Sequence, residues 1–158
     1  MKTSQKRINR IKAQGYFDCT NSEISKLAFG NRFAYILCTI IVITGVATAN
    51  IPILLSMFLV AFLSILLPNH PFDYIYNYLL RKLMDKPKLP PRSKQLKFAC
   101  SIASIFLAAT VSLFYLNHMI AGYIVGTLLI ISASLVAGLD ICIPSIIYNA
   151  IYKIKPNS

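Results

Sequence analysis

The chain has 158 residues, of which 56% are hydrophobic and only 13% are charged. A soluble domain carries about a quarter charged residues because its surface must be hydrated, so this composition excludes an ordinary soluble globule, a disordered chain and a coiled coil. It indicates a membrane protein. Sixteen Lys and Arg against five Asp and Glu give a net charge of +11, and the distribution of this charge must distinguish nucleic-acid binding from membrane topology.

Four uncharged apolar runs predict four membrane-spanning helices in an all-α polytopic protein. Their lengths of 17 to 21 residues suit a hydrocarbon core about 30 Å thick, and they cover residues 33–49, 51–67, 98–116 and 119–139. Residues 1–15 are polar and basic, so the first apolar run begins too late for a cleavable signal peptide. We therefore expect the first span to be retained.

The basic residues lie on one side of these spans. The linkers at residues 50–52 and 117–118 contain no Lys or Arg, whereas residues 1–32, 68–97 and 153–155 hold all sixteen. This segregation predicts two hairpins, with the N-terminus and the C-terminus both cytoplasmic. It argues against nucleic acid as a partner, because the charges flank spans. The expected partners are the bilayer and anionic headgroups on its cytoplasmic side.

This pattern divides the chain into five segments. In order they are a basic cytoplasmic N-terminal segment, a first transmembrane hairpin, a basic cytoplasmic loop with an amphipathic helix, a second hairpin and a cytoplasmic amphipathic tail, at residues 1–32, 33–67, 68–97, 98–143 and 144–158.

Short helices are predicted in the cytoplasmic segments. Apolar residues recur at helical spacing over residues 72–84, where Asp73, Asn77 and Arg81 form a polar stripe, and again over residues 145–155. Both stretches are typical of helices that lie in the interface with basic residues toward anionic headgroups. A capping-box pattern at residues 20–23 predicts a helix start at Asn21. Residues 1–15 lack periodicity and are expected to be mobile.

The two hairpins resemble each other. A basic residue, Phe and Ala open both the first and the third span, at residues 32–34 and 97–99, and a Tyr-Asn pair follows each hairpin, at residues 76–77 and 148–149. A duplicated hairpin, with an axis along the membrane normal, explains the pattern. Chance similarity between apolar sequences is the alternative, and both interpretations stay open.

Small residues mark the fourth span as a packing centre. Gly122 and Gly126 form a G-x-x-x-G motif, and Ala133 and Ala137 continue the small-residue spacing. Packing within the bundle is the favoured interpretation, because four spans must pack in any case. Homodimerisation through the same face is the alternative.

Two cysteines at the cytoplasmic margins are candidate reactive thiols. Cys19 lies at an expected helix N-terminus, which can lower the pKa of a thiol, and Cys142 lies beside Pro144. If the N-terminal segment folds beneath the bundle, the two thiols can meet, and a reducing cytoplasm favours a redox or sulfur-handling pair over a permanent disulfide. Two unconnected thiols are the alternative. Cys38 and Cys100 lie inside spans and are expected to be packing residues.

Asp140 follows the fourth span without an intervening polar segment and is a candidate polar site. A hydrated interfacial carboxylate, or a cap for the following turn, is the alternative. His70 and His118 lie on opposite sides, so they cannot share a metal, and each is expected to be an isolated interfacial residue. No paired carboxylates, Ser/His/Asp set or phosphate-binding loop is evident, so enzymatic function has little support and no catalytic residue, metal or cofactor is predicted.

Several of these features occur together in one known pattern: an N-terminal cysteine, a polar segment ending in Asn-Arg, an apolar hairpin, a basic loop, a basic-Phe-Ala entry and a closing cysteine, here Cys19, Asn31-Arg32, Lys97-Phe98-Ala99 and Cys142. In this order, over about residues 16–152, the chain resembles a bacterial integral-membrane family catalogued as domain of unknown function 4395. Many members close with two cysteines, whereas only Cys142 stands here, which weakens a redox inference. The resemblance implies that the protein lies in a bacterial inner membrane, and it supplies no activity.

Three functions follow as hypotheses. The first is a non-enzymatic accessory or scaffold component that packs with another membrane protein or as a homodimer. The second is a membrane thiol-redox or sulfur-handling protein that uses Cys19 and Cys142. The third is a small carrier built from the two hairpins, for which Asp140, serines and threonines would have to supply an ion site.

Overall fold

The computed structural model describes residues 4–17, 19–84 and 86–154. Within these ranges every regular element is a helix, which confirms the all-helical prediction. Three helices in this part of the chain are long and apolar enough to cross a membrane: α2 (Asn21–Ala47), α6 (Lys94–Tyr115) and α7 (Met119–Leu139). The protein thus has the helices of a membrane protein. Helix α3 (Ile51–Leu66) is strongly apolar but has only 16 residues.

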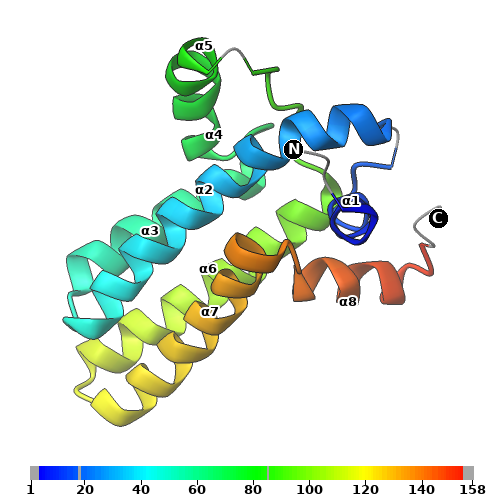
Figure 1. The fold of residues 1–158 in the computed structure, drawn as a ribbon. Coiled ribbons are helices and arrows are strands. Elements are labelled where there is room, and N and C mark those ends of the chain that lie inside the picture. The colour runs from blue at the N-terminus through cyan, green and yellow to red at the C-terminus, as the bar shows by residue number, and fades with distance from the viewer. Residues whose placement is uncertain (1–3, 18, 85, 155–158) are drawn as a thin grey trace.

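These four helices form a bundle (Figure 1). Helix α2 packs against α3 and α7, and α6 packs against the same two helices, so the four close into a ring. Each helix contributes a buried apolar side chain to the centre: Val42, Leu54, Leu107 and Leu129. The core is therefore shared by both hairpins.

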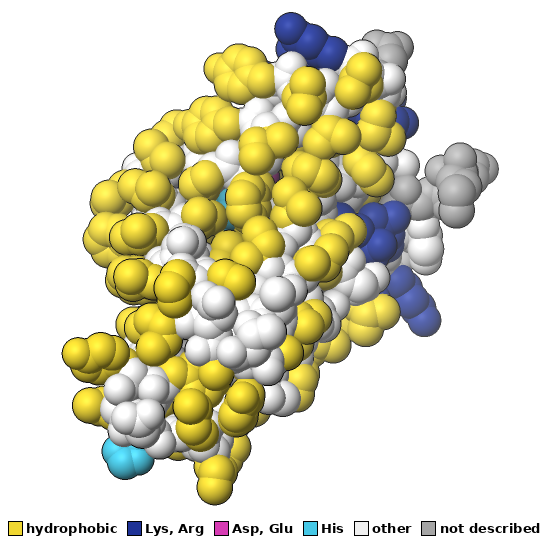
Figure 2. Space-filling view, turned by 90° about the vertical axis from the view of Figure 1, so that its left-hand side faces the viewer, with side chains coloured by type: hydrophobic (Ala, Val, Ile, Leu, Met, Phe, Trp, Pro, Cys, Tyr) yellow, Lys and Arg dark blue, Asp and Glu magenta, His cyan; other side chains and the backbone are white. Residues whose placement is uncertain are grey.

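The outside of the bundle is apolar. Each of the four helices exposes large apolar side chains, for example Ile40, Leu59, Ile105 and Ile124, which are all more than half exposed. Figure 2 shows such side chains covering the side of the bundle, while Lys and Arg side chains gather toward one end. An apolar surface of this extent indicates contact with lipid.

The short helices lie together at one end of the bundle (Figure 1). They are α1 (Gln5–Lys12), α8 (Ile143–Ile151) and a continuous helical stretch made of α4 (Pro71–Ile75), the π-helical turn η1 (Tyr76–Leu80) and α5 (Arg81–Leu83). Between α3 and the α4–α5 stretch the chain bends by 80°. The α4–α5 stretch therefore runs across the end of the bundle, where an interface would lie.

The predicted mobility of residues 1–15 is wrong for α1. Ile8 and Ile11 are buried in an apolar cluster with Tyr16, Ile24 and Leu96. Their spacing of three residues places both on one face of a helix. Two apolar positions in eight residues make a weak periodic signal, which explains why the sequence did not predict this helix.

The predicted start of α2 is confirmed. Thr20 is the N-cap residue and forms a capping box with Glu23: the Thr20 side chain accepts from the Glu23 N–H, and the Glu23 carboxylate accepts from the Thr20 N–H. Helix α2 thus begins twelve positions before the first apolar run, and Figure 1 shows its first turns crossing the end of the bundle.

The α4–α5 stretch turns its polar stripe inward. Asp73 and Asn77 are buried against the protein, whereas Leu79 and Leu83 are 61% and 78% exposed. The side-chain oxygen of Asn77 accepts from the backbone N–H of Leu89, at 2.8 Å. The stripe was expected to be the hydrated side of an interfacial helix, but it anchors that helix to the protein instead.

Helix α8 repeats this arrangement. Ser145 and Asn149 are buried, while Ile147 and Ile151 are exposed. Asn149 donates to the carbonyl of Ala13 at 2.8 Å. Both short helices therefore present apolar side chains outward, which suits the boundary between headgroups and acyl chains.

Candidate functional site

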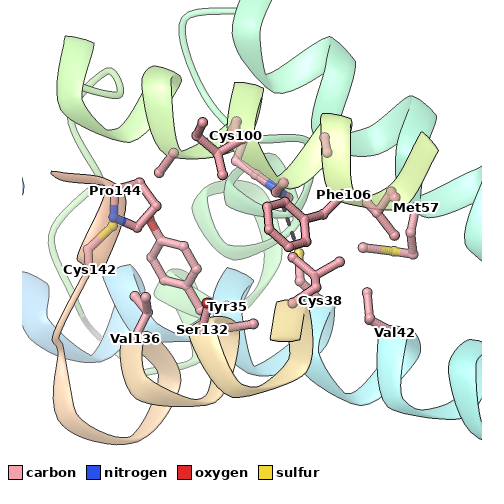
Figure 3. A pocket seen from close by; sticks show the side chains of 18 residues that line it. Tyr35, Cys38, Val42, Met57, Cys100, Phe106, Ser132, Val136, Cys142 and Pro144 are labelled. Carbon is pink, nitrogen blue, oxygen red and sulfur yellow. Dashed lines mark hydrogen bonds between the residues drawn. The ribbon is translucent and has the colours of Figure 1, made fainter. Parts of the chain in front are cut away.

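A cavity of about 120 Å³ lies at the centre of the bundle. All four long helices line it, together with His70 and the first turn of α8. An apolar protein cavity of about 150 Å³ holds a benzene molecule, so this one has room for a ligand of only a few non-hydrogen atoms. Most of the wall is apolar, and Figure 3 shows Val42, Met57, Phe106 and Val136 among its side chains.

Three thiols line this cavity: Cys38 from α2, Cys100 from α6 and Cys142, the N-cap residue of α8 (Figure 3). All three are free thiols. Tyr35, Cys38 and Val42 are spaced at i, i+3 and i+7, so they share the face of α2 that points into the bundle. Segments far apart in the sequence thus bring sulfur atoms to one small space.

This grouping differs from the predicted one. Cys38 and Cys100 were expected to be packing residues, yet both contribute to the cavity wall. Cys19 instead packs against the two apolar clusters beneath the bundle, which contain Ile24 and Tyr76, and it is not among the cavity-lining residues. The structure therefore groups Cys142 with Cys38 and Cys100, and the proposed pairing of Cys142 with Cys19 has no shared cavity to support it.

His70 is a buried part of the site, which corrects its interpretation as an isolated interfacial residue. It is 6% exposed and caps the N-terminus of α4. Its Nδ1 accepts a hydrogen bond from the backbone N–H of Phe72 at 3.2 Å, and its Nε2 lies 3.6 Å from the Sγ of Cys38. Because a neutral ring that accepts at Nδ1 carries its proton on Nε2, the imidazole directs an N–H at the Cys38 sulfur.

A buried ion pair holds His70 in place. Asp73 accepts two hydrogen bonds from Arg92, with Nε–Oδ2 and Nη2–Oδ1 distances of 2.6 Å each. The same carboxylate accepts the backbone N–H of His70 at 3.1 Å. Arg92 also donates from Nη1 to the hydroxyl of Tyr35 at 2.9 Å. Tyr35 lies one turn before Cys38 on α2 and is part of the cavity wall. A chain of hydrogen bonds therefore connects Tyr35 to Arg92, Arg92 to Asp73, and Asp73 to the backbone of His70.

The cavity is electrically neutral around pH 7. Burial, together with the positive charge of Arg92, lowers the pKa of His70 to about 4 against the opposing effect of Asp73, so the ring is uncharged. Burial also raises the pKa of the Cys142 thiol, although a hydrogen bond from Ser145 to its sulfur at 3.0 Å opposes this effect. Arg92 and Asp73 compensate each other. The site therefore favours an uncharged ligand.

Asp140 belongs to a separate network at the end of the bundle. It ends α7 in the left-handed conformation, is 1% exposed and accepts hydrogen bonds from Arg7 and Arg32, with Nε–carboxylate distances of 2.8 Å each. Gln14 donates to its backbone carbonyl at 2.9 Å, and Arg10 donates to the carbonyl of Leu139 at 3.0 Å. The structure thus places the candidate polar site where it holds the N-terminal segment, outside the cavity wall.

The small residues of α7 meet other helices of the same chain. A Cβ added to Gly122 would lie 2.5 Å from the ring of Phe114, and one added to Gly126 would lie 2.8 Å from Val46. Ala133 lines the cavity, and Ala137 is half-buried. Gly122 and Gly126 thus pack against α6 and α2 of the same chain.

In the described ranges, no group of three or more His, Cys, Asp or Glu side chains is arranged to hold a metal ion. His118 occupies the N-cap position of α7 at the far end of the bundle, where it is exposed and makes no side-chain capping hydrogen bond. The chemistry that the described residues can offer at the cavity is therefore that of thiols with nearby hydrogen-bond donors.

The chain belongs to the family described as a domain of unknown function, DUF4395, whose sequence profile matches residues 29–153. This confirms the resemblance given by the sequence. No significant match was found among curated proteins or among solved structures. The matched range includes α3, α6, α7 and all of α2 except its first eight residues, together with the three cavity thiols and His70.

Proposed function

We propose that the protein is a membrane thiol protein in which Cys38, Cys100 and Cys142 react with a small uncharged molecule inside the bundle. The observation that carries this proposal is the convergence of three thiols and one imidazole, from four separate segments, on one cavity of about 120 Å³. Apolar side chains alone would fill such a space more stably.

We further propose that α3 is a fourth span. Its 16 residues reach about 24 Å, which is short for a hydrocarbon core of about 30 Å. However, α3 is one of the four helices that close the ring, and it lies between α2 and α6. Its outward residues, such as Leu59, are as exposed as those of the other three helices. The bend into α4 lets the chain leave the membrane at the headgroup level. The charge distribution supports cytoplasmic termini, because the basic segments gather at the end of the bundle where α4 lies.

The packing supports the duplication hypothesis. Helix α2 packs against α7, and its counterpart in the second hairpin, α6, packs against α3. In the same way, the short helix α4 packs against α2, and its counterpart α8 packs against α6. His70 and Cys142 are both N-cap residues of the short helices that follow the hairpins, and both line the cavity. Asn77 and Asn149 are both buried anchors of these helices. A cavity between two related hairpins is where repeat-built membrane proteins place their binding sites.

The chemistry of the site favours a reaction at sulfur. An uncharged cavity admits uncharged molecules, and the raised pKa of Cys142 favours the protonated form of that thiol. His70 and Ser145 each direct a donor at a sulfur, so they can stabilise negative charge that develops on it during a reaction. Small disulfides and related molecules with a polarised bond to sulfur fit this description.

This proposal places the thiol hypothesis ahead of the accessory and carrier hypotheses. An accessory component needs a surface and does not require thiols at its centre. A carrier for an ordinary metabolite needs a pocket of about 300 Å³ or more, well above the volume of this cavity. The thiol pair envisaged from the sequence is replaced by the three cavity thiols.

The experiment compares two methanethiosulfonate reagents that carry the same reactive group. A Cys19→Ala protein in detergent is treated with the neutral methyl reagent or with the anionic sulfonatoethyl reagent, and intact-protein mass counts the modified thiols. We expect the neutral reagent to modify cavity thiols in the folded protein and the anionic reagent to leave them unmodified. Both reagents should modify three thiols after denaturation. A folded protein that the neutral reagent does not modify would contradict the proposal and restore the accessory hypothesis.

A further inference from the structure

We infer that Cys38 is the thiol that attacks first, and that His70 is its positioning residue, donating a hydrogen bond from Nε2–H to the sulfur. The inference rests on the proposed function and deepens it. The substrate class is an uncharged molecule with a polarised S–S bond, such as a small disulfide or a thiosulfonate.

The orientation of the His70 ring is fixed at several points. The Phe72 N–H occupies Nδ1 at 3.2 Å, and Asp73 accepts the backbone N–H of His70 at 3.1 Å. The bidentate contact with Arg92 in turn fixes the carboxylate of Asp73. A donor held in this way stabilises developing charge without reorganising during the reaction. It cannot accept a proton at Nε2 in this tautomer, so we assign it a donor role and no role as general base.

Cys38 has a better position than Cys142, and it differs from Cys100, which is also partly exposed, in the donor that His70 supplies. Cys142 is only 3% exposed, whereas Cys38 is partly exposed, so a reagent reaches Cys38 with less displacement of neighbouring atoms. The donor to Cys142 is the hydroxyl of Ser145, whose hydrogen has no fixed direction. The donor to Cys38 is a ring N–H with one direction. The aligned donor favours attack by the Cys38 sulfur.

The reaction is a thiol–disulfide exchange, in which one S–S bond forms and one breaks. The Cys38 sulfur forms a bond to one sulfur of the substrate R–S–S–R, and the S–S bond of the substrate breaks. The departing sulfur leaves as a thiolate and takes up the proton that Cys38 loses. Atoms and electrons balance, because the substrate disulfide is converted into a mixed disulfide with Cys38 and one free thiol. With methyl methanethiosulfonate, the leaving group is methanesulfinate.

Single-cysteine proteins test the inference. One retains Cys38 and the other retains Cys100, with the remaining cysteines replaced by Ala, and each is combined with His70→Asn and with His70→Gln. Asn caps helices well and can accept the Phe72 N–H, but it is too short to donate to Cys38. Gln can reach the position of Nε2 with an amide N–H. The rate of modification by the neutral methyl reagent is measured by mass as a function of pH.

We expect His70→Asn to slow the modification of Cys38 about tenfold, which corresponds to the loss of one hydrogen bond to a sulfur that gains charge. His70→Gln should stay within about threefold of the parent rate, and the rate at Cys100 should change little in either variant. Equal rates at Cys38 in the Asn and Gln variants would overturn the inference, as would a parallel loss at Cys100. If neither thiol reacts while His70 is intact, the proposed function itself fails.

Discussion

Asp73 and Arg92 form a bidentate ion pair in which both side chains are almost fully buried, at 1% and 3% exposure. Asp73 lies in the first turn of α4, and Arg92 ends the extended linker that leads to α6. The pair therefore ties the two ends of the loop between the hairpins together, directly behind His70. Charges buried in this way stabilise a fold only while both are present.

Replacing Asp73 by Asn should destabilise the protein strongly. The substitution leaves the Arg92 guanidinium buried without a counter-charge, at a cost of about 3–5 kcal/mol. Thermal unfolding in mild detergent measures the change. Replacing Glu23, an exposed carboxylate, by Gln is the matched control and should shift Tm much less.

A double variant separates the lost charge from lost packing. Asp73→Leu combined with Arg92→Met removes both charges, so it should be more stable than Asp73→Asn alone. A double variant that is less stable than the single one would show that the pair contributes favourable energy beyond compensation of charge.

Stability should fall as pH decreases between about 6.5 and 4. The pKa of His70 is lowered to about 4 in the folded protein, whereas an unfolded chain has a value of about 6.5. The unfolded state therefore binds more protons within this window, so stability is fully present above pH 6.5 and is lost as pH falls toward 4. The shift corresponds to about 3 kcal/mol. The difference in Tm between the parent and His70→Gln, measured from pH 7 to pH 4, should shrink across this window.

The sequence predicted the helices well because hydropathy is a local property. Apolar runs separated by short polar turns placed α3 and α7 nearly to the residue, and the Thr20–Glu23 spacing located the start of α2. The sequence could not predict the cavity, because the three thiols belong to segments whose proximity depends on how the helices pack. Spacing on one helix shows which residues share a face but not what that face meets.

The interfacial helices show a second limit of sequence reasoning. The stripe of Asp73, Asn77 and Arg81 has the spacing of a hydrated face, and nothing local distinguishes it from a face bonded inside the protein. The distinguishing information lies in Arg92 and Leu89, which supply the partners from another segment. In a membrane protein the outward face can be the apolar one, so amphipathic spacing alone leaves the orientation of such a helix open.

Asp140 should hold the N-terminal segment, including α1, against the end of the bundle. Asp140→Asn removes the charge that Arg7 and Arg32 bind, while Asn tolerates the left-handed conformation of this position. Loss of these charged hydrogen bonds should raise the population of the undocked segment about tenfold. Limited trypsin digestion measures it as faster cleavage after Arg10 and Lys12. Glu23→Gln should leave the cleavage rate unchanged, and an unchanged rate in Asp140→Asn would contradict this role of Asp140.

The exposed apolar face of the α4–α5 stretch should contact lipid. Leu79 and Leu83 make few internal contacts, so replacing both by Asp should change Tm little in detergent. In bilayer nanodiscs the same double variant should unfold at a lower temperature, because each carboxylate enters the boundary between headgroups and acyl chains. Lys86→Asp in the exposed linker controls for charge alone. Equal behaviour in detergent and nanodiscs would show that this face meets water.

Reporter fusions should find both termini on the cytoplasmic side. The short helices, the basic loop and both ends of the described chain lie at one end of the bundle, and the turns at Asn50 and Asn117 lie at the other (Figure 1). All Lys and Arg residues that the structure describes fall in the segments of the first end, and the positive-inside rule predicts that this end lies in the cytoplasm. Fusions of a cytoplasm-active reporter at residues 1 and 158 should be active, and those at Asn50 and Asn117 inactive. A periplasm-active reporter at the same four positions should give the complementary result. Activity of the cytoplasmic reporter at Asn50 or Asn117 would exclude two complete hairpins. Activity at Asn117, with none at Asn50 or at residue 158, would show that α3 does not span the membrane.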